Sequence, residues 1–250
     1  MGLFNNLTTS GLEETTDRLG GGSRVIDTDI YSGRIAVAYH GTSAKGAQFI
    51  ALHFKHDDQE YKETIYITNQ KGENFFLNKD DKTKKVPLPG FVVIDDLCLI
   101  ATEKPLCEQE TEEKVVNIYD FDLKKEVPKS VQVLTGLTDA PISLGIVKAL
   151  EDKTKLNDQT KEYEPTGETR EVNNIEKVFH TELHLTVPEA RAGKDRGEFW
   201  DAWLAKNKGQ IRDKTKKDGA KSGAPTGAAP GSAAPAAAAQ ARPSLFGAKK

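Results

Sequence analysis

The sequence predicts a mainly β, α+β fold that carries a C-terminal helix and a disordered tail. Residues 29–68 hold three consecutive runs in which apolar and polar side chains alternate with period two, the pattern of half-buried strands. Residues 91–101 are almost continuously apolar, and residues 188–208 carry both tryptophans of the chain at helical spacing. From residue 213 onward Ala, Gly, Pro, Ser and Lys dominate and no apolar face remains, so we expect this part to be disordered.

Each of the three predicted strands has one apolar face and one chemically mixed face. We expect the core to be contacted by Tyr31, Ile35, Val37, Tyr39, Ile50, Leu52, Phe54, Ile65 and Ile67. The opposite face holds Arg34, Phe49, His53, Lys55, Lys62 and Tyr66. Cations interleaved with aromatic rings suit a single nucleic-acid strand, because it offers phosphates and the flat faces of bases. The alternatives are that Phe49 packs under another element, that Tyr66 is an ordinary cross-strand residue, or that the register is shifted by one, which would exchange the two faces.

A second basic and aromatic stretch follows the strands. Residues 71–85 surround two phenylalanines with five lysines, namely Lys71, Lys79, Lys82, Lys84 and Lys85. The Gly and Asn content is typical of loops, so we interpret the stretch as a basic lip over the sheet. Adjacent strand residues point in opposite directions, and we therefore expect one of Phe75 and Phe76 to be core and the other to be available for stacking.

The remaining elements are justified in chain order. Residues 91–101 fit a buried helix or a strand, and Asp95 and Asp96 favour the helix because they interrupt the apolar run on one side. Further strands are expected at residues 115–121, 131–137, 142–150 and 169–179, with polar turns at residues 157–158 and 165–167. Residues 178–187 alternate like a strand as well. Residues 188–208 are expected to form one helix, with a core stripe made of Phe199, Trp200, Trp203 and Leu204.

Composition and motifs argue against several classes of protein. The chain has 250 residues with 37% hydrophobic content, enough for a packed core. Cys98 and Cys107 form no disulfide framework, no run approaches the roughly 20 apolar residues that cross a bilayer, and no signal peptide is recognisable, so we expect a cytosolic protein. His180 and His184 have no zinc-finger spacing to these cysteines. With no phosphate loop or nucleophile motif either, we expect a non-enzymatic protein without metal or cofactor.

Charge is distributed unevenly along the chain. Residues 212–250 contain eight basic and two acidic residues, a net charge of +6, whereas the other 211 residues carry 27 basic and 36 acidic residues, a net charge of −9. An acidic body that binds nucleic acid must gather its cations locally. We divide the chain into an N-terminal arm at residues 1–23, a binding domain at residues 24–212 and a disordered linker with an interaction peptide at residues 213–250. The peptide ends the tail with Leu245, Phe246, Lys249 and Lys250, which we expect to bind a partner protein.

Five segments of the chain resemble the single-stranded DNA-binding proteins of podovirus-type bacteriophages. They are DIYSGRIAVAY at 29–39, YKETIYITNQKGENFF at 61–76, KKVPLPGFVVIDDLCLIATEKPL at 84–106, EEKVVNIYDF at 112–121 and EFWDAWLAKNKG at 198–209. The resemblance implies an elaborated OB-fold, a five-stranded barrel with an inserted helix, which coats exposed strands cooperatively during phage DNA replication and recombination. Many single-stranded DNA-binding proteins end in an acidic tip. The basic tip of this chain departs from that pattern.

Two functional hypotheses follow from these observations. In the first, a sequence-tolerant single-stranded DNA-binding protein stacks bases on Phe49, Tyr66 and one of Phe75 or Phe76. Its phosphate contacts come from Arg34, Lys55, Lys62, Lys71, Lys82, Lys84 and Lys85, with His53 on the same face. The tail then recruits replication, recombination or transcription proteins. In the second, the chain is a transcription accessory module that binds RNA polymerase through its basic tail and uses the body as a scaffold.

Overall fold

The computed structural model describes residues 25–120, 123–157, 163–215 and 245. The predicted N-terminal arm lies outside the described residues. Within them the fold is mainly β, as predicted. The strands are β1 (Asp29–Thr42), β2 (Gln48–His56), β3 (Gln59–Tyr66), β4 (Phe75–Leu77), β5 (Lys85–Pro87), β6 (Thr111–Asp120), β7 (Lys125–Leu134), β8 (Pro141–Leu156), β9 (Tyr163–Phe179) and β10 (Ile211–Asp213). The α-helices are α1 (Pro89–Thr102), α2 (Val187–Arg191) and α3 (Phe199–Asn207).

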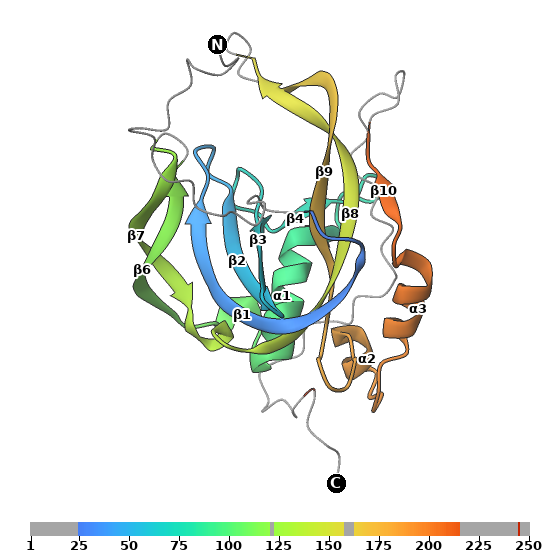
Figure 1. Cartoon of the computed structure of the whole chain (residues 1–250). Coiled ribbons are helices and arrows are strands. Elements are labelled where there is room, and N and C mark those ends of the chain that lie inside the picture. Colours follow the sequence, from blue (N-terminus) through green and yellow to red (C-terminus); the bar gives the residue numbers. More distant parts are fainter. Residues whose placement is uncertain (1–24, 121–122, 158–162, 216–244, 246–250) are drawn as a thin grey trace, which may run out of the picture.

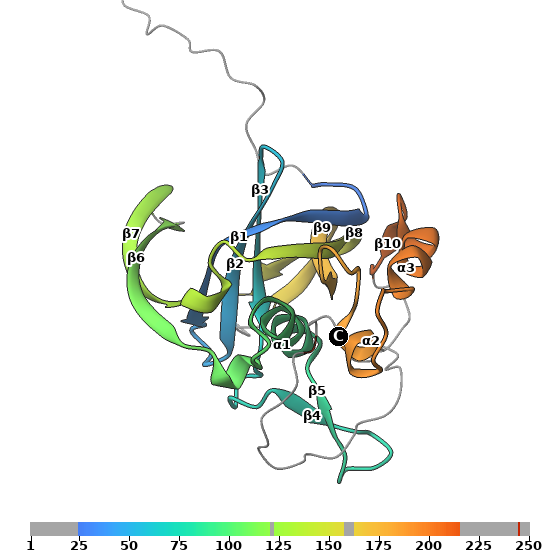
Figure 2. The ribbon, with the colours of Figure 1, turned by 90° about the horizontal axis from the view of Figure 1, so that it is seen from below.

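Eight of these strands form one curved sheet in the order β10-β8-β1-β2-β3. The β6–β7 hairpin joins this sheet through β7 and β1, and β9 pairs with β8. All the pairs are antiparallel except β10 with β8. Figures 1 and 2 show the β6–β7 hairpin at one end of the sheet and the β8–β9 hairpin toward the other. The three strands predicted at residues 29–68 and the helix predicted at residues 91–101 are confirmed.

The closed five-stranded barrel that the resemblance implies is not found. Within the described residues β3 pairs only with β2, so no ladder joins the two ends of the sheet. A side chain bridges part of this gap, because the backbone N–H of Ile175 in β9 donates to Glu63 Oε2 in β3 at 2.9 Å. The Tyr61 hydroxyl donates to the same oxygen at 2.6 Å. Burial raises the pKa of the Glu63 carboxyl against the opposing effect of these two hydrogen bonds.

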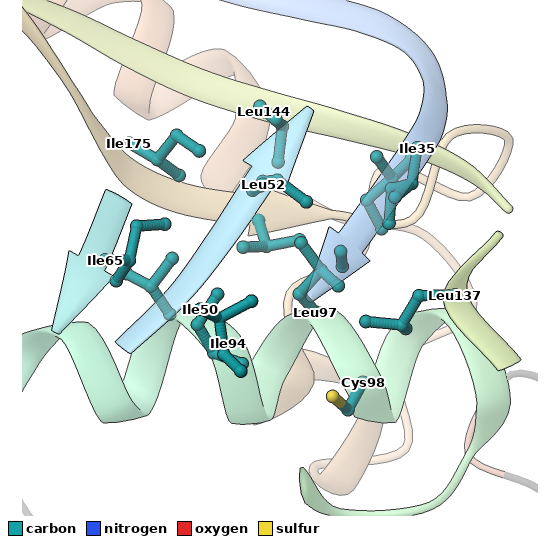
Figure 3. Packing of buried hydrophobic residues seen from close by; sticks show 14 of the residues in the cluster. Ile35, Ile50, Leu52, Ile65, Ile94, Leu97, Cys98, Leu137, Leu144 and Ile175 are labelled. Carbon is teal, nitrogen blue, oxygen red and sulfur yellow. The ribbon is translucent and has the colours of Figure 1, made fainter. Parts of the chain in front are cut away.

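The main core lies between the sheet and α1. Ile94, Leu97 and Cys98 of α1 are fully buried against Leu52 of β2 and Leu144 of β8, as Figure 3 shows. Pro89 opens the helix, where its missing N–H costs no hydrogen bond.

Gly90 lets the first turn of α1 approach β3. A Cβ at Gly90 would lie 2.2 Å from the carbonyl oxygen of Tyr66, a distance that no side chain tolerates. The glycine therefore permits the close contact between the start of α1 and the end of β3, the strand that carries Tyr66.

One prediction about β1 is wrong because the strand contains a bulge. Ile35 pairs with Phe54 and Val37 pairs with His53, so Ala36 is an extra residue without a partner on β2. A bulge of one residue reverses the alternation of side chains. Ile35 therefore joins the main core with α1, whereas Val37 and Tyr39 belong to a second apolar cluster on the opposite face.

The helix predicted at residues 188–208 is also wrong, since two short helices replace it. Gly193, two residues after the end of α2, has a φ of 74°, a left-handed conformation that ends the helix. At Gly197 a Cβ would lie 1.9 Å from the carbonyl oxygen of His184, so this close approach also requires glycine. Glu189 of α2 instead accepts hydrogen bonds from the backbone N–H groups of Glu198 and Phe199, both at 2.9 Å, and so caps the start of α3. The core stripe is confirmed for Trp203, which is buried, whereas Phe199 is 40% exposed.

The segments around β8 and β9 differ from the prediction in two places. The two strands extend as one long hairpin beyond the predicted ranges, through residues 151–156 and 163–168, with an irregularity between Asp152 and Thr154. The turn predicted at residues 165–167 is therefore wrong, because these residues belong to β9. Residues 180–186 form a turn closed by the hydrogen bond from the N–H of His180 to the carbonyl oxygen of Leu185, not a strand. The alternation of side chains therefore predicts a strand beyond residue 179 that the structure does not have, and it predicts β8 and β9 too short.

Replacing Leu97 with alanine tests the packing of α1 on the sheet. Leu97 is fully buried, and we expect Leu97→Ala to lower the free energy of unfolding by about 2–5 kcal/mol through lost contacts and the cavity left behind. Urea denaturation followed by circular dichroism measures the change. Val115→Ala is the control, because Val115 is 71% exposed. Equal losses in the two variants would contradict the described core.

Candidate nucleic-acid interface

The face of β2 and β3 that points away from α1 carries the predicted site residues of these two strands. Phe49 lies opposite Tyr66, His53 opposite Lys62, and Lys55 opposite Glu60 in the antiparallel register. Directly opposed residues share one face of a sheet. The predicted outward set of these two strands therefore lies together, and Glu60 lies among its cations.

Two aromatic rings form a pair at one end of this face. The ring centroids of Phe49 and Tyr66 are 5.7 Å apart with an edge-to-face angle of 66°. Tyr66 is 51% exposed, whereas Phe49 is half-buried and packs on the second apolar cluster. Phe49 therefore supports the Tyr66 ring, and Tyr66 is the ring of this pair that offers more surface to a base.

The β6–β7 hairpin forms a second wall beside these strands. The second apolar cluster joins Tyr39, Ala51 and Val133 with partly buried side chains, namely Val37, Phe49, Val116, Ile118 and Val131. Figure 2 shows the hairpin curving on the side of β1 and β2 opposite α1. We call the surface of β2, β3 and this hairpin the open face. Strands were predicted from the sequence in residues 111–134, but no part of the site was. The alternating valines and isoleucine of residues 116–118 and 131–133 are nevertheless a signal of one apolar side.

A cluster of charged groups crosses the open face. Lys62 Nζ lies 3.1 Å from Glu60 Oε2 and 3.9 Å from Glu126 Oε1 of β7, and His53 Nδ1 lies 3.4 Å from Glu60 Oε1. Partial burial and the charge of Lys62 lower the pKa of His53, against the opposing effect of Glu60. Burial would raise the pKa of Glu60, but hydrogen bonding and attraction to Lys62 outweigh it and hold that pKa below its usual value. At neutral pH the cluster therefore contains an ionised Glu60 and an uncharged His53.

Arg34 and Lys55 lie together at the bulge of β1. They pair across β1 and β2 and help to line a shallow pocket of about 550 Å³ that Asp57 and Asp139 also line. Arg34 Nη1 donates to the carbonyl oxygen of Asp139 at 2.7 Å and to its carboxylate at 3.2 Å. Lys55 is exposed and makes no ion pair within the described part of the chain. Of these two cations, Lys55 is the one free to meet a phosphate.

The predicted basic lip is the β4–β5 hairpin, and it lies next to α1. Figure 2 shows α1 between this hairpin and the three strands, so its lysines form a surface apart from the open face. Lys85 Nζ lies 4.3 Å above the ring of Phe75, and Phe76 is 46% exposed. Neither ring belongs to the buried core, contrary to the expectation that one would.

The lysines around this hairpin differ in their partners. Lys84 pairs with Asp81 at 3.4 Å. Lys71, in the turn after β3, and Lys82 are exposed and make no ion pair among the described residues. The structure thus divides the predicted cations between two surfaces.

Only one residue of the predicted tail peptide falls within the described part. Leu245 is half-buried and packs against the main core, whereas Phe246, Lys249 and Lys250 lie outside the described residues. Among the residues that the structure covers, no group of three His, Cys, Asp or Glu side chains is placed to hold a metal ion. No helix there is long and apolar enough to span a bilayer.

A scan of protein-family models, a search of curated proteins and a search of solved structures each found no match to this chain. The resemblance to phage proteins therefore stays a prediction, and the function is to be argued from the residues and geometry of the open face.

The titration of His53 tests the arrangement of the charged cluster. We expect its NMR titration midpoint to lie below the ordinary value of about 6.5, because burial and Lys62 favour the neutral ring. Lys62→Met should raise the midpoint and Glu60→Gln should lower it further, since these changes remove opposite influences. Lys104→Met, on the loop after α1, is the control and should leave it unchanged. Shifts in the reverse directions would show that the three groups are not neighbours.

Proposed function

We propose that this chain is a non-enzymatic protein that binds single-stranded DNA with little sequence preference on its open face. The observation that carries the proposal is the half-exposed ring of Tyr66, supported by Phe49 and placed on the same sheet face as His53, Lys62 and Lys55. Every base has a π-face, so stacking on a ring tolerates all sequences and contributes about 1–3 kcal/mol per base.

The electrostatics support binding that depends only moderately on salt. Each phosphate neutralised on a single strand contributes a slope of roughly 0.7 to the dependence of log affinity on log salt. Lys55 makes no ion pair with any carboxylate among the described residues, whereas Lys62 and Arg34 are already paired with carboxylates. We therefore expect few phosphate contacts from this face and a correspondingly shallow slope.

An elaborated OB-fold is part of the proposal. Three antiparallel strands, followed by the short β4–β5 hairpin and then a helix, support a relation to that fold, as does an open face on the second and third strands. The resemblance adds the proposed setting, which is the coating of exposed strands in phage DNA replication and recombination within the bacterial cytoplasm. Self-association along DNA and recruitment of replication, recombination or transcription proteins by the tail complete the proposal.

One observation favours a second candidate function. Arg34, Lys62 and Lys84 each lie within ion-pair distance of a carboxylate, which reduces the positive potential that they offer to DNA. A transcription accessory module that binds RNA polymerase through its basic tail would need no strong DNA-binding face. It would bind oligonucleotides weakly and polymerase tightly.

Tyr66→Ala is the sharpest test of the leading proposal. Loss of one stacking ring should weaken binding to a fluorescein-labelled oligo(dT) by about 5- to 150-fold, the equivalent of about 1–3 kcal/mol. Fluorescence anisotropy is the suitable measurement, because both tryptophans lie on α3 and not on the open face. Phe199→Ala removes a comparably exposed ring on α3 and should change affinity little. Unchanged affinity in a folded Tyr66→Ala protein would remove this residue from the site.

Deletion of residues 244–250 separates the two roles of the tail. If the peptide docks on a partner protein, oligo(dT) affinity of the shortened chain should stay within about twofold of the full chain at low salt, since no phosphate contact is lost. Anisotropy titrations at two salt concentrations measure it. A large loss at low salt that disappears at high salt would make the peptide part of the DNA-binding surface.

A further inference from the structure

Lys62 on the open face is held between two carboxylates in the free protein. Glu60 lies two residues away on the same strand, at 3.1 Å, whereas Glu126 reaches Lys62 from the β6–β7 hairpin at 3.9 Å. All three side chains are partly exposed, with 47% of Lys62, 35% of Glu60 and 56% of Glu126 accessible. A ligand can therefore reach these side chains, and an ion pair of Lys62 can be exchanged for a contact with that ligand.

A nucleic-acid phosphate would compete for the same ammonium group. Carboxylate and phosphate oxygens both accept hydrogen bonds from Lys, so one can take the place of the other. Glu60 is fixed beside Lys62 by the register of β3 and by its contact with His53. Glu126 makes the longer contact and belongs to a separate hairpin, so it is the carboxylate that can withdraw.

We infer that Glu126 is a built-in competitor of the nucleic-acid strand, which holds Lys62 and ties the β6–β7 hairpin to β3 until a phosphate takes its place. This inference rests on the proposed function. It adds an autoinhibitory contact and assigns a role to the hairpin. Binding then exchanges one ion pair for another and releases the start of β7 from β3.

A double-mutant cycle on the full chain tests the exchange. The four proteins are the wild type, Glu126→Gln, Lys62→Met and the double variant, titrated with fluorescein-labelled oligo(dT) at low salt. Glu126→Gln should tighten binding about two- to fivefold, the range expected from releasing one exposed ion pair. In the Lys62→Met background the same change should have no effect, because no ammonium remains to be released. Glu182→Gln, in the turn before α2, is the control for the loss of one negative charge.

Hydrogen exchange on the free protein gives a readout that needs no nucleic acid. Glu126→Gln and Lys62→Met should each speed amide exchange in β7, and the double variant should exchange no faster than either. The inference is overturned if exchange in β7 is unchanged, or if Glu126→Gln tightens binding equally in both backgrounds or no more than Glu182→Gln. If no chain binds oligo(dT) while exchange responds as expected, the proposed function fails and the contact between Lys62 and Glu126 stands.

Discussion

The bulge at Ala36 is the constraint on which the rest of the structure depends. A regular strand would send Ile35 and Val37 to the same side of the sheet, and one of the two apolar clusters would lose its contribution from β1. With one extra residue, Ile35 packs with α1 while Val37 and Tyr39 pack with the β6–β7 hairpin. β1 thus contributes apolar side chains to clusters on both faces of the sheet. The hairpin can curve beside β2 and β3 because the second cluster gives it an apolar surface to pack on.

The open face combines features that work against each other. The acidic body supplies carboxylates beside several of its cations, and Glu60 and Glu126 in particular reduce the charge that Lys62 offers to solvent. Tyr66 carries no such penalty, since a ring stacks on a base whatever the surrounding charge. The recognition proposed for this chain therefore relies more on the paired rings than on phosphate contacts, as a sequence-tolerant binder with an acidic body requires.

The sequence predicted the local patterns well and the spatial arrangement only in part. Alternation located β1, β2 and β3, and it placed Phe49, His53 and Tyr66 on the same side as the structure does. It failed where one residue changes the geometry. The bulge in β1 reverses parity without a distinct residue type, and Gly193, in a left-handed conformation, ends α2 inside the predicted helix. The separation of the β4–β5 lysines from the open face, and the second wall from residues 111–134, depend on long-range packing that no local pattern encodes.

Mapping the binding surface on the intact chain tests directly whether single-stranded DNA binds to the open face. Backbone and side-chain NMR signals of the labelled protein would be followed as oligo(dT) is added. We expect the largest shifts at Tyr66, Thr64 and His53 and at Val116 and Ile118 of the facing hairpin. Shifts confined to the β4–β5 hairpin, to α3 or to the tail, with the open face silent, would contradict it.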